Sequence, residues 1–270
     1  MDYPTPDSLD TADRVAVRDF YRSRGIVPCH SKEDFRCPHA GECSATARRR
    51  NAEFHTGTWP YVGVDYGSAS VSGHHVRVLF VAMERGGTYD LEDEPTFTNT
   101  QENFRDSAES HHNAHMGGTS QLMQCLVDDK EPSVYSHQFA LTNAVKCVEF
   151  TGSQNSSSSA TMIDNCSEHL REEIRLLRPH LLITQGDHPK RTVLRLLSPL
   201  RLVCSFKGVA GIAEVFLDSQ IAVLTTPHAA RKKGWPWKRG PLPEFLQSAV
   251  RCAADEALGL MGRGVQGAAP

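Results

Sequence analysis

The sequence predicts a single three-layer α/β/α domain with a mainly parallel central sheet. Apolar runs of strand length recur along the chain, and segments with helical spacing of apolar residues follow them. This alternation favours parallel strands joined by crossover helices. Because 39% of the 270 residues are hydrophobic, the chain can build a sizeable core. The expected strands cover residues 76–84, 139–147, 181–186 and 221–228.

The helices are expected around and between these strands. The first covers residues 11–25, where Thr11 or Asp10 suits an N-cap and Gly25 suits a helix stop. Residues 26–60 are expected to be rich in loops, and the serine-rich stretch 148–162 to be a polar loop that cannot pack a core. Further helices are expected at 117–129, 163–180, 189–200 and 241–261.

The domain limits follow from these elements. We expect an N-terminal helical extension over 1–28, the main domain with its metal-cluster loops over 29–258, and a flexible tail over 259–270. No apolar run has the length to cross a bilayer, and the acidic first residues do not resemble a signal peptide, so a cytoplasmic protein is expected. No dimerisation surface is evident, and a monomer is the default expectation.

The net charge of the chain does not indicate a nucleic-acid partner, but local clusters of basic residues do. The net charge is −3, which excludes a strongly basic protein. Basic clusters do occur, and Arg231, Lys232 and Lys233 form one of them. Such runs are often only solvated surface, but they also suit contacts to phosphates.

The chain has eight cysteines, which are unlikely partners for disulfides in a reducing compartment. Three of them fall within fifteen residues, at Cys29, Cys37 and Cys43, and two more, Cys147 and Cys166, flank the serine-rich loop. This grouping indicates metal ligation. The remaining three are expected to be buried free thiols: Cys125, Cys204 and Cys252.

Polar side chains stand at the ends of three expected strands. Glu84 follows the run VLFVAM, Asn143 lies within the second strand segment, and His228 ends the last one. In open α/β sheets, ligands bind at the carboxyl ends of the strands. A carboxylate, an amide and an imidazole are therefore expected to converge on one crevice.

The order of these segments resembles the uracil-DNA glycosylase superfamily, in particular its iron–sulfur branches. The matching motifs are AMERG (82–86), EPTF (94–97), TNAVKC (142–147), NCSEHLREEIRLLRPHLLITQG (165–186) and TTPHAARK (225–232). The resemblance implies a uracil-DNA-glycosylase-like fold. It also implies a [4Fe–4S] cluster with Cys37, Cys43, Cys147 and Cys166 as ligands. The first pair is spaced Cys-x5-Cys, wider than the Cys-x2-Cys usual in the family, so Cys29 could replace Cys37 or Cys43 as a ligand. Zinc is the alternative metal, because His30 and His39 lie in the same stretch as further ligands.

The resemblance also implies roles for the residues of the crevice. Glu84 matches the position that orients the attacking water, and His228 matches the histidine that stabilises the departing base, so both are expected to be catalytic. Met83 stands where the iron–sulfur branches often have their glutamate. The expected base-binding residues are Met83, Gly86, the stacking residue Phe97, and Asn143, which reads the base edge. Arg231, Lys232 and Lys233 are expected to contact DNA.

Together these features predict a monofunctional DNA glycosylase that flips a pyrimidine out of DNA and leaves an abasic site. A modified, C5-enlarged base of the kind found in phage DNA is expected, because Gly86 leaves room and a polar insertion over 98–116 lies beside Phe97. Such an enzyme suits antiviral defence. Uracil excision in DNA repair, a non-catalytic DNA-binding relative and a zinc-bearing nuclease are the alternatives.

Overall fold

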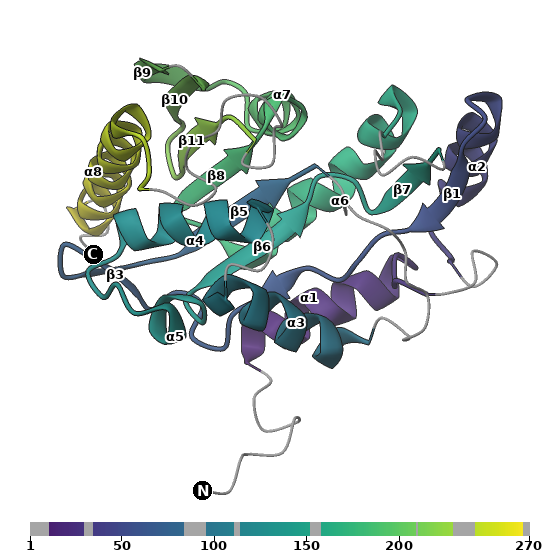
Figure 1. The fold of residues 1–270 in the computed structure, drawn as a ribbon, viewed down its shortest axis with the longest axis horizontal. Coiled ribbons are helices and arrows are strands. Elements are labelled where there is room, and N and C mark those ends of the chain that lie inside the picture. Colours follow the sequence, from purple (N-terminus) through teal and green to yellow (C-terminus); the bar gives the residue numbers. More distant parts are fainter. Residues whose placement is uncertain are drawn as a thin grey trace, which may run out of the picture.

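The computed structural model describes residues 11–29, 35–83, 96–110, 114–151, 158–208, 210–228 and 241–266. These residues form a mixed α/β fold around a seven-stranded sheet, shown in Figure 1. The expected α/β architecture with a mainly parallel centre is therefore confirmed. None of the described helices combines the length and apolar character that a membrane-spanning segment requires.

The central sheet has the strand order β2-β6-β5-β8-β11-β10-β9. Its four middle strands are parallel, whereas β2 at one edge and the β10–β9 pair at the other are antiparallel to their neighbours. The strands are β2 (Tyr61–Val62), β5 (Val78–Ala82), β6 (Phe139–Asn143), β8 (Leu181–Gln185), β9 (Arg201–Gly208), β10 (Gly211–Leu217) and β11 (Ala222–Thr226). Two small pairs lie outside this sheet: β1 (Glu53–Thr56) with β7 (Cys147–Phe150), and β3 (Ala69–Val71) with β4 (His74–Val76).

Helices cover both faces of the sheet. Successive residues of a buried strand point to opposite faces, and in β5 Val78 and Phe80 belong to one core whereas Leu79 and Val81 belong to the other. The helices are α1 (Ala12–Ser23), α2 (Ala40–Arg49), α3 (Phe97–Ser110), α4 (Ala114–Leu126), α5 (Pro132–Tyr135), α6 (Ala160–Leu177), α7 (Asp187–Leu196) and α8 (Glu244–Gln266). The α2–β1–β7 region lies at the end of the molecule opposite α8 (Figure 1).

Several helix boundaries follow the local chemistry of the sequence. The hydroxyl of Thr11 accepts a hydrogen bond from the amide of Arg14 and so caps α1. Ser159 caps α6 in the same way through the amide of Met162. Arg178 ends α6 in the left-handed conformation just before Pro179, which cannot continue the helix.

The structure differs from several of the element predictions. The strand expected over 139–147 is two strands, because β6 ends at Asn143 and Cys147 begins β7. The loop-rich stretch 26–60 contains α2 and β1, and the polar insertion 98–116 is helical over its described residues. The hairpin β9–β10 was not predicted; all residues of β9 are exposed or partly buried, whereas Ala213, Val215 and Leu217 of β10 are buried. At the C-terminus α8 continues to Gln266, so the segment from 259 is not a flexible tail over its described part.

One cysteine prediction is wrong. Cys204 on β9 and Cys252 on α8 form a disulfide rather than two free thiols. Both residues lie where α8 packs against the β9–β10 hairpin, so the bond joins the last helix to the sheet edge. Cys125 is free, as expected, although it is only partly buried.

A buried ion pair lies between the sheet and α6. Lys146 and Glu173 have side chains 1% and 0% exposed, and the ammonium group contacts the carboxylate directly. Glu173 also accepts hydrogen bonds from the Tyr21 hydroxyl at 2.6 Å and the Thr142 hydroxyl at 2.9 Å. Lys146 Nζ donates to Thr142 Oγ1 at 2.8 Å and to the Asn143 carbonyl at 2.5 Å. Both charges are thus satisfied, as burial requires.

We predict that Tyr21→Phe lowers the free energy of unfolding by about 1.5–3 kcal/mol, because it removes a hydrogen bond to a charged, buried acceptor. Tyr66→Phe is the matched control: its hydroxyl donates to the neutral Leu177 carbonyl at 3.0 Å and is also buried. That variant is expected to lose only about 0.5–1.5 kcal/mol. Urea unfolding of both variants measures the difference, and equal losses would contradict a charge-assisted bond at Tyr21.

Candidate functional site

The carboxyl ends of the four parallel strands bring the candidate site residues to one edge of the sheet. Asn143 ends β6 and pairs in register with Ala82 at the end of β5, directly before Met83. On the other side, Gln185 ends β8 in register with Thr226 of β11, two residues before His228. Asn143 and His228 therefore lie at the same edge of the sheet, with the ends of β5 and β8 between them. Their expected convergence with Glu84 on one crevice stays a prediction.

The turn after Asn143 is tied to the end of β5 by backbone hydrogen bonds. The Ala144 amide donates to the Ala82 carbonyl at 2.7 Å, and the Val145 amide donates to the Met83 carbonyl at 2.9 Å. The next amide, of Lys146, donates to the Cys166 sulfur at 3.3 Å. Asn143 itself is buried, with 8% of its surface exposed. Its position is therefore fixed relative to Met83, the last described residue before Glu84.

His228 lies against Gly186, the residue that follows β8. A Cβ atom built on Gly186 would lie 3.3 Å from the Cβ and 3.5 Å from the Cδ2 of His228. Gly186 also has φ +109°, a conformation that other residues rarely adopt, and its amide donates to the Thr226 carbonyl at 2.8 Å. Glycine at this position thus permits the close approach of His228 to the sheet edge.

A second histidine, His115, stacks on His228. Their ring centroids are 5.5 Å apart and their planes differ by 26°. His115 lies in the first turn of α4, within the insertion expected beside the site, but no individual role was predicted for it. Burial and the neighbouring His228 lower the pKa of His115 to about 4, against the opposing effect of a hydrogen bond with Gln185. At neutral pH its ring is therefore uncharged.

The structure places Phe97 in the core. The residue is 8% exposed, and its ring meets the Trp59 ring edge-on at a centroid distance of 5.4 Å. The Arg18 guanidinium lies 5.9 Å from the centroid of the same ring. These contacts account for its burial; its expected role in base stacking stays a prediction. Glu84, Gly86, Arg231, Lys232 and Lys233 lie outside the described residues.

The four expected metal-ligating cysteines come from separate parts of the chain and meet next to the Lys146–Glu173 pair. Cys37 precedes α2, Cys43 lies in α2, Cys147 begins β7 and Cys166 lies in α6. Cys43, Cys147 and Cys166 are buried, and Cys37 is partly buried. Across the described part of the chain, no three His, Cys, Asp or Glu side chains are arranged to hold a single metal ion.

The thiols influence one another electrostatically. Hydrogen bonds of Cys147 with Cys166 and Cys43 raise its pKa well above the usual value. The same contacts lower the pKa of Cys166 and lower that of Cys43 to about 7. Burial raises the pKa of Cys37 to about 11, and its sulfur lies 3.9 Å from Nε2 of His169. His169, which the sequence did not single out, thus borders the cysteine group.

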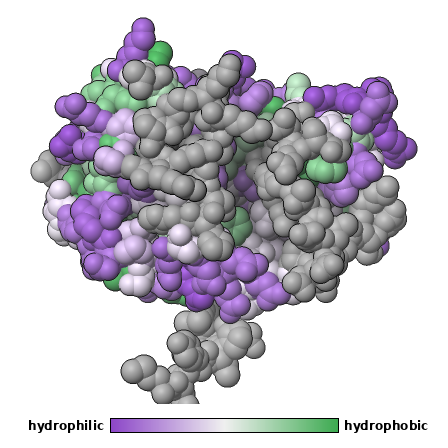
Figure 2. All heavy atoms as spheres, viewed as in Figure 1, coloured by the Kyte–Doolittle hydropathy of each residue, from purple (hydrophilic) through white to green (hydrophobic). Residues whose placement is uncertain are grey.

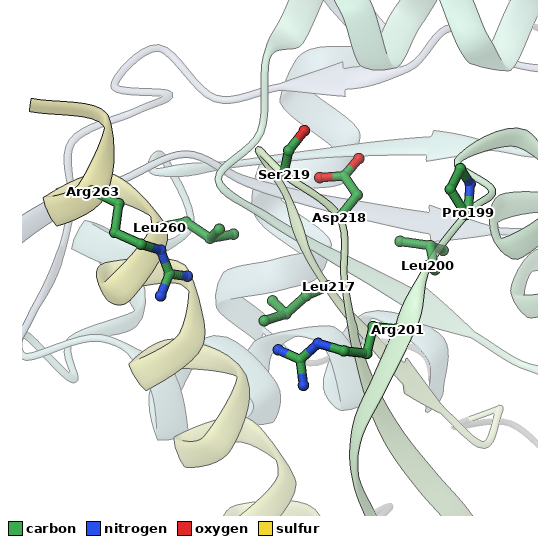
Figure 3. A pocket seen from close by; sticks show the side chains of 8 residues that line it. All are labelled: Pro199, Leu200, Arg201, Leu217, Asp218, Ser219, Leu260 and Arg263. Atoms are coloured by element: carbon green, nitrogen blue, oxygen red, sulfur yellow. The ribbon is translucent and has the colours of Figure 1, made fainter. Parts of the chain in front are cut away.

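A surface pocket of about 610 Å³ lies elsewhere and is not part of this site. Figure 3 shows Leu260 and Arg263 of α8 beside the β9–β10 hairpin residues Arg201, Leu217 and Asp218. Leu217 pairs with Ala222 at the amino end of β11, whereas His228 follows the carboxyl end of that strand. The described surface facing the viewer in Figure 2 is mostly hydrophilic and presents no broad apolar area.

Comparison with known families agrees with the fold. Residues 70–242, more than half of the chain, match the sequence model of the uracil DNA glycosylase superfamily. The chain therefore belongs to the uracil-DNA glycosylase superfamily. This membership indicates a DNA glycosylase, an enzyme that binds DNA. No curated protein sequence matches the chain.

The low pKa of His115 predicts that the folded state loses stability as the pH falls from about 6.5 toward 4. In this range the unfolded chain binds a proton at residue 115 and the folded chain does not, so acid favours unfolding. Urea unfolding at pH 7.5 and pH 5 is expected to show a smaller loss of stability for His115→Phe than for the wild type. The exposed His74→Phe variant serves as the control, with the wild-type pH dependence. An unchanged pH dependence in His115→Phe would contradict the prediction.

Proposed function

We propose that this protein is a monofunctional DNA glycosylase that excises a modified, C5-enlarged pyrimidine and leaves an abasic site. The observation that carries the proposal is the placement of Asn143, Met83 and His228 at or just after the carboxyl ends of β6, β5 and β11, three of the four parallel strands, in a member of this superfamily. Excision of such a base from foreign DNA suits antiviral defence. Uracil is the alternative substrate, and the test below distinguishes it from a modified base.

The reaction needs a base outside the helical stack, a group that reads it and groups that support bond cleavage. Asn143 offers both a donor and an acceptor to the edge of a pyrimidine. Glu84, which follows Met83 directly in the chain, is proposed to orient the attacking water and to stabilise the positive charge on the sugar. His228 is proposed to donate a hydrogen bond to the departing base as negative charge develops on it.

The substrate proposal rests on the room that two glycines leave for a C5 substituent and on the insertion over 98–116. Gly86 and Gly87 have no side chains that would exclude a substituent at C5 of the base. Met83 and Phe97 are proposed to contact the base, and Arg231, Lys232 and Lys233 to contact phosphates. The insertion, helical in its described part, brings His115 against His228, so the insertion reaches the proposed base-binding region.

A panel of DNAs tests the substrate. Duplexes that contain uracil, 5-hydroxymethylcytosine or glucosylated hydroxymethylcytosine are incubated with the protein, and free bases are identified by mass spectrometry. We expect release of a C5-modified base. Release of uracil alone would show that uracil, and not a modified base, is the substrate. No release from any duplex would favour a DNA-binding protein without catalysis.

Glu84→Gln tests the catalytic assignment. The amide keeps the size of the side chain but removes its charge, so we predict a fall in kcat of about 10²–10⁴-fold with DNA binding retained. Glu102→Gln, at an exposed position of α3, is the matched control and is expected to match the wild type. Full activity in Glu84→Gln would show that another group activates the water.

We further propose that Cys37, Cys43, Cys147 and Cys166 hold a [4Fe–4S] cluster. The donor chemistry fits, because a cluster of this type takes four thiolates and these four thiols approach one another from separate elements. A bound cluster would supply structural cross-linking of the segment before α2 to β7 and α6. Zinc on the same thiols is the alternative.

Iron analysis of anaerobically purified protein tests the cluster. The wild type is expected to contain about four irons and four acid-labile sulfides per chain. Cys166→Ala is expected to lose them, whereas Cys125→Ala keeps them because Cys125 is a free thiol outside this group. Zinc in place of iron, or equal iron in both variants, would contradict the cluster proposal.

A further inference from the structure

The insertion over 98–116 is built into the domain rather than attached to its surface. Gln101 of α3 accepts from the Val62 amide at 2.8 Å and donates to the Pro60 carbonyl at 2.8 Å, which fixes α3 to the edge of the sheet. Ser120 of α4 donates to the carbonyl of the fully buried Ala108 at 2.8 Å. These bonds hold the start of α4, and with it His115, in a defined place.

The ring of His115 is held from the sheet side as well. It forms a hydrogen bond with the side chain of Gln185, and Gln185 Nε2 donates to Thr119 Oγ1 at 3.0 Å. Thr119, one turn further along α4, in turn donates to the His115 carbonyl at 3.1 Å. The result is a closed set of contacts between the end of β8 and the first turn of α4. Nε2 of His115 is buried and has no hydrogen-bond partner among the described residues.

This partly buried ring presents its face to His228. The rings are stacked at 5.5 Å, and Gly186 lies close to the Cβ and Cδ2 of the same histidine. Stacking limits the orientations that the His228 ring can adopt. Exclusion of unproductive orientations favours the reactive arrangement. Because the aromatic face of His115 is uncharged at neutral pH, it accommodates His228 in either protonation state.

We propose that His115 is a positioning residue that fixes the ring of His228 by stacking on it. The inference rests on the proposed function, because it assigns the supported ring, His228, to base release. The polar insertion then has a definite use, which is to bring an aromatic face against His228 at the β8–β11 end of the sheet edge. His115 acts through His228 and needs no contact with the DNA.

Two variants of similar size separate stacking from filling of space. His115→Phe keeps a flat aromatic face, whereas His115→Leu keeps an apolar side chain without one. We expect His115→Phe to retain kcat within about threefold and His115→Leu to lose about 10- to 100-fold, with KM within about threefold of the wild type in both. Urea unfolding of each variant checks that both variants are folded under the conditions of the activity assay.

The outcomes distinguish this inference from the proposed function. Equal activity of His115→Phe and His115→Leu, at either a high or a low level, would overturn the stacking role while leaving base release in place. A loss in His115→Leu that appears only in KM would also overturn it, because positioning of His228 acts on the chemical step. Absence of base release from the wild type on every duplex would overturn the proposed function and this inference with it.

Discussion

The buried contact between Lys146 and Glu173 is the interaction on which the arrangement of the site depends. A buried ion pair is a weak source of net stability, because desolvation of both charges offsets their attraction. Its effect here is geometric. The carboxylate of α6 holds Lys146, and Lys146 Nζ reaches back to the Asn143 carbonyl at 2.5 Å. The pair therefore fixes the turn between β6 and β7 against the helix that crosses behind it.

Two candidate centres meet at this turn. On one side, the amides of Ala144 and Val145 join it to the end of β5, so that Asn143 is held in register with Met83. On the other side, the Lys146 amide donates to the Cys166 sulfur, and Cys147 follows at once in the chain. Asn143, the residue proposed to read the base, and Cys147, at the cysteine group, are thus four residues apart in the chain.

The sequence was sufficient for the buried parts of this arrangement. Continuous apolar runs predicted β5, β8 and β11. The strand ends of Asn143 and His228 share one edge of the sheet, as the carboxyl ends of parallel strands do. The insertion was harder: α3 has few apolar residues, and its attachment depends on Gln101, whose partners are backbone groups distant in the sequence. The His115–His228 contact and the Cys204–Cys252 bond are likewise made through space, where no local pattern indicates them.

Amide hydrogen exchange at the β6–β7 turn tests the role of the ion pair most directly. Lys146→Met combined with Glu173→Leu replaces both charges by apolar groups of similar size, a change that folded proteins often tolerate. The account predicts that protection of the Ala144, Val145 and Lys146 amides falls at least about tenfold, whereas protection within β8 is unchanged. Wild-type protection at all three turn amides in this double variant would show that backbone contacts alone hold Asn143 in place.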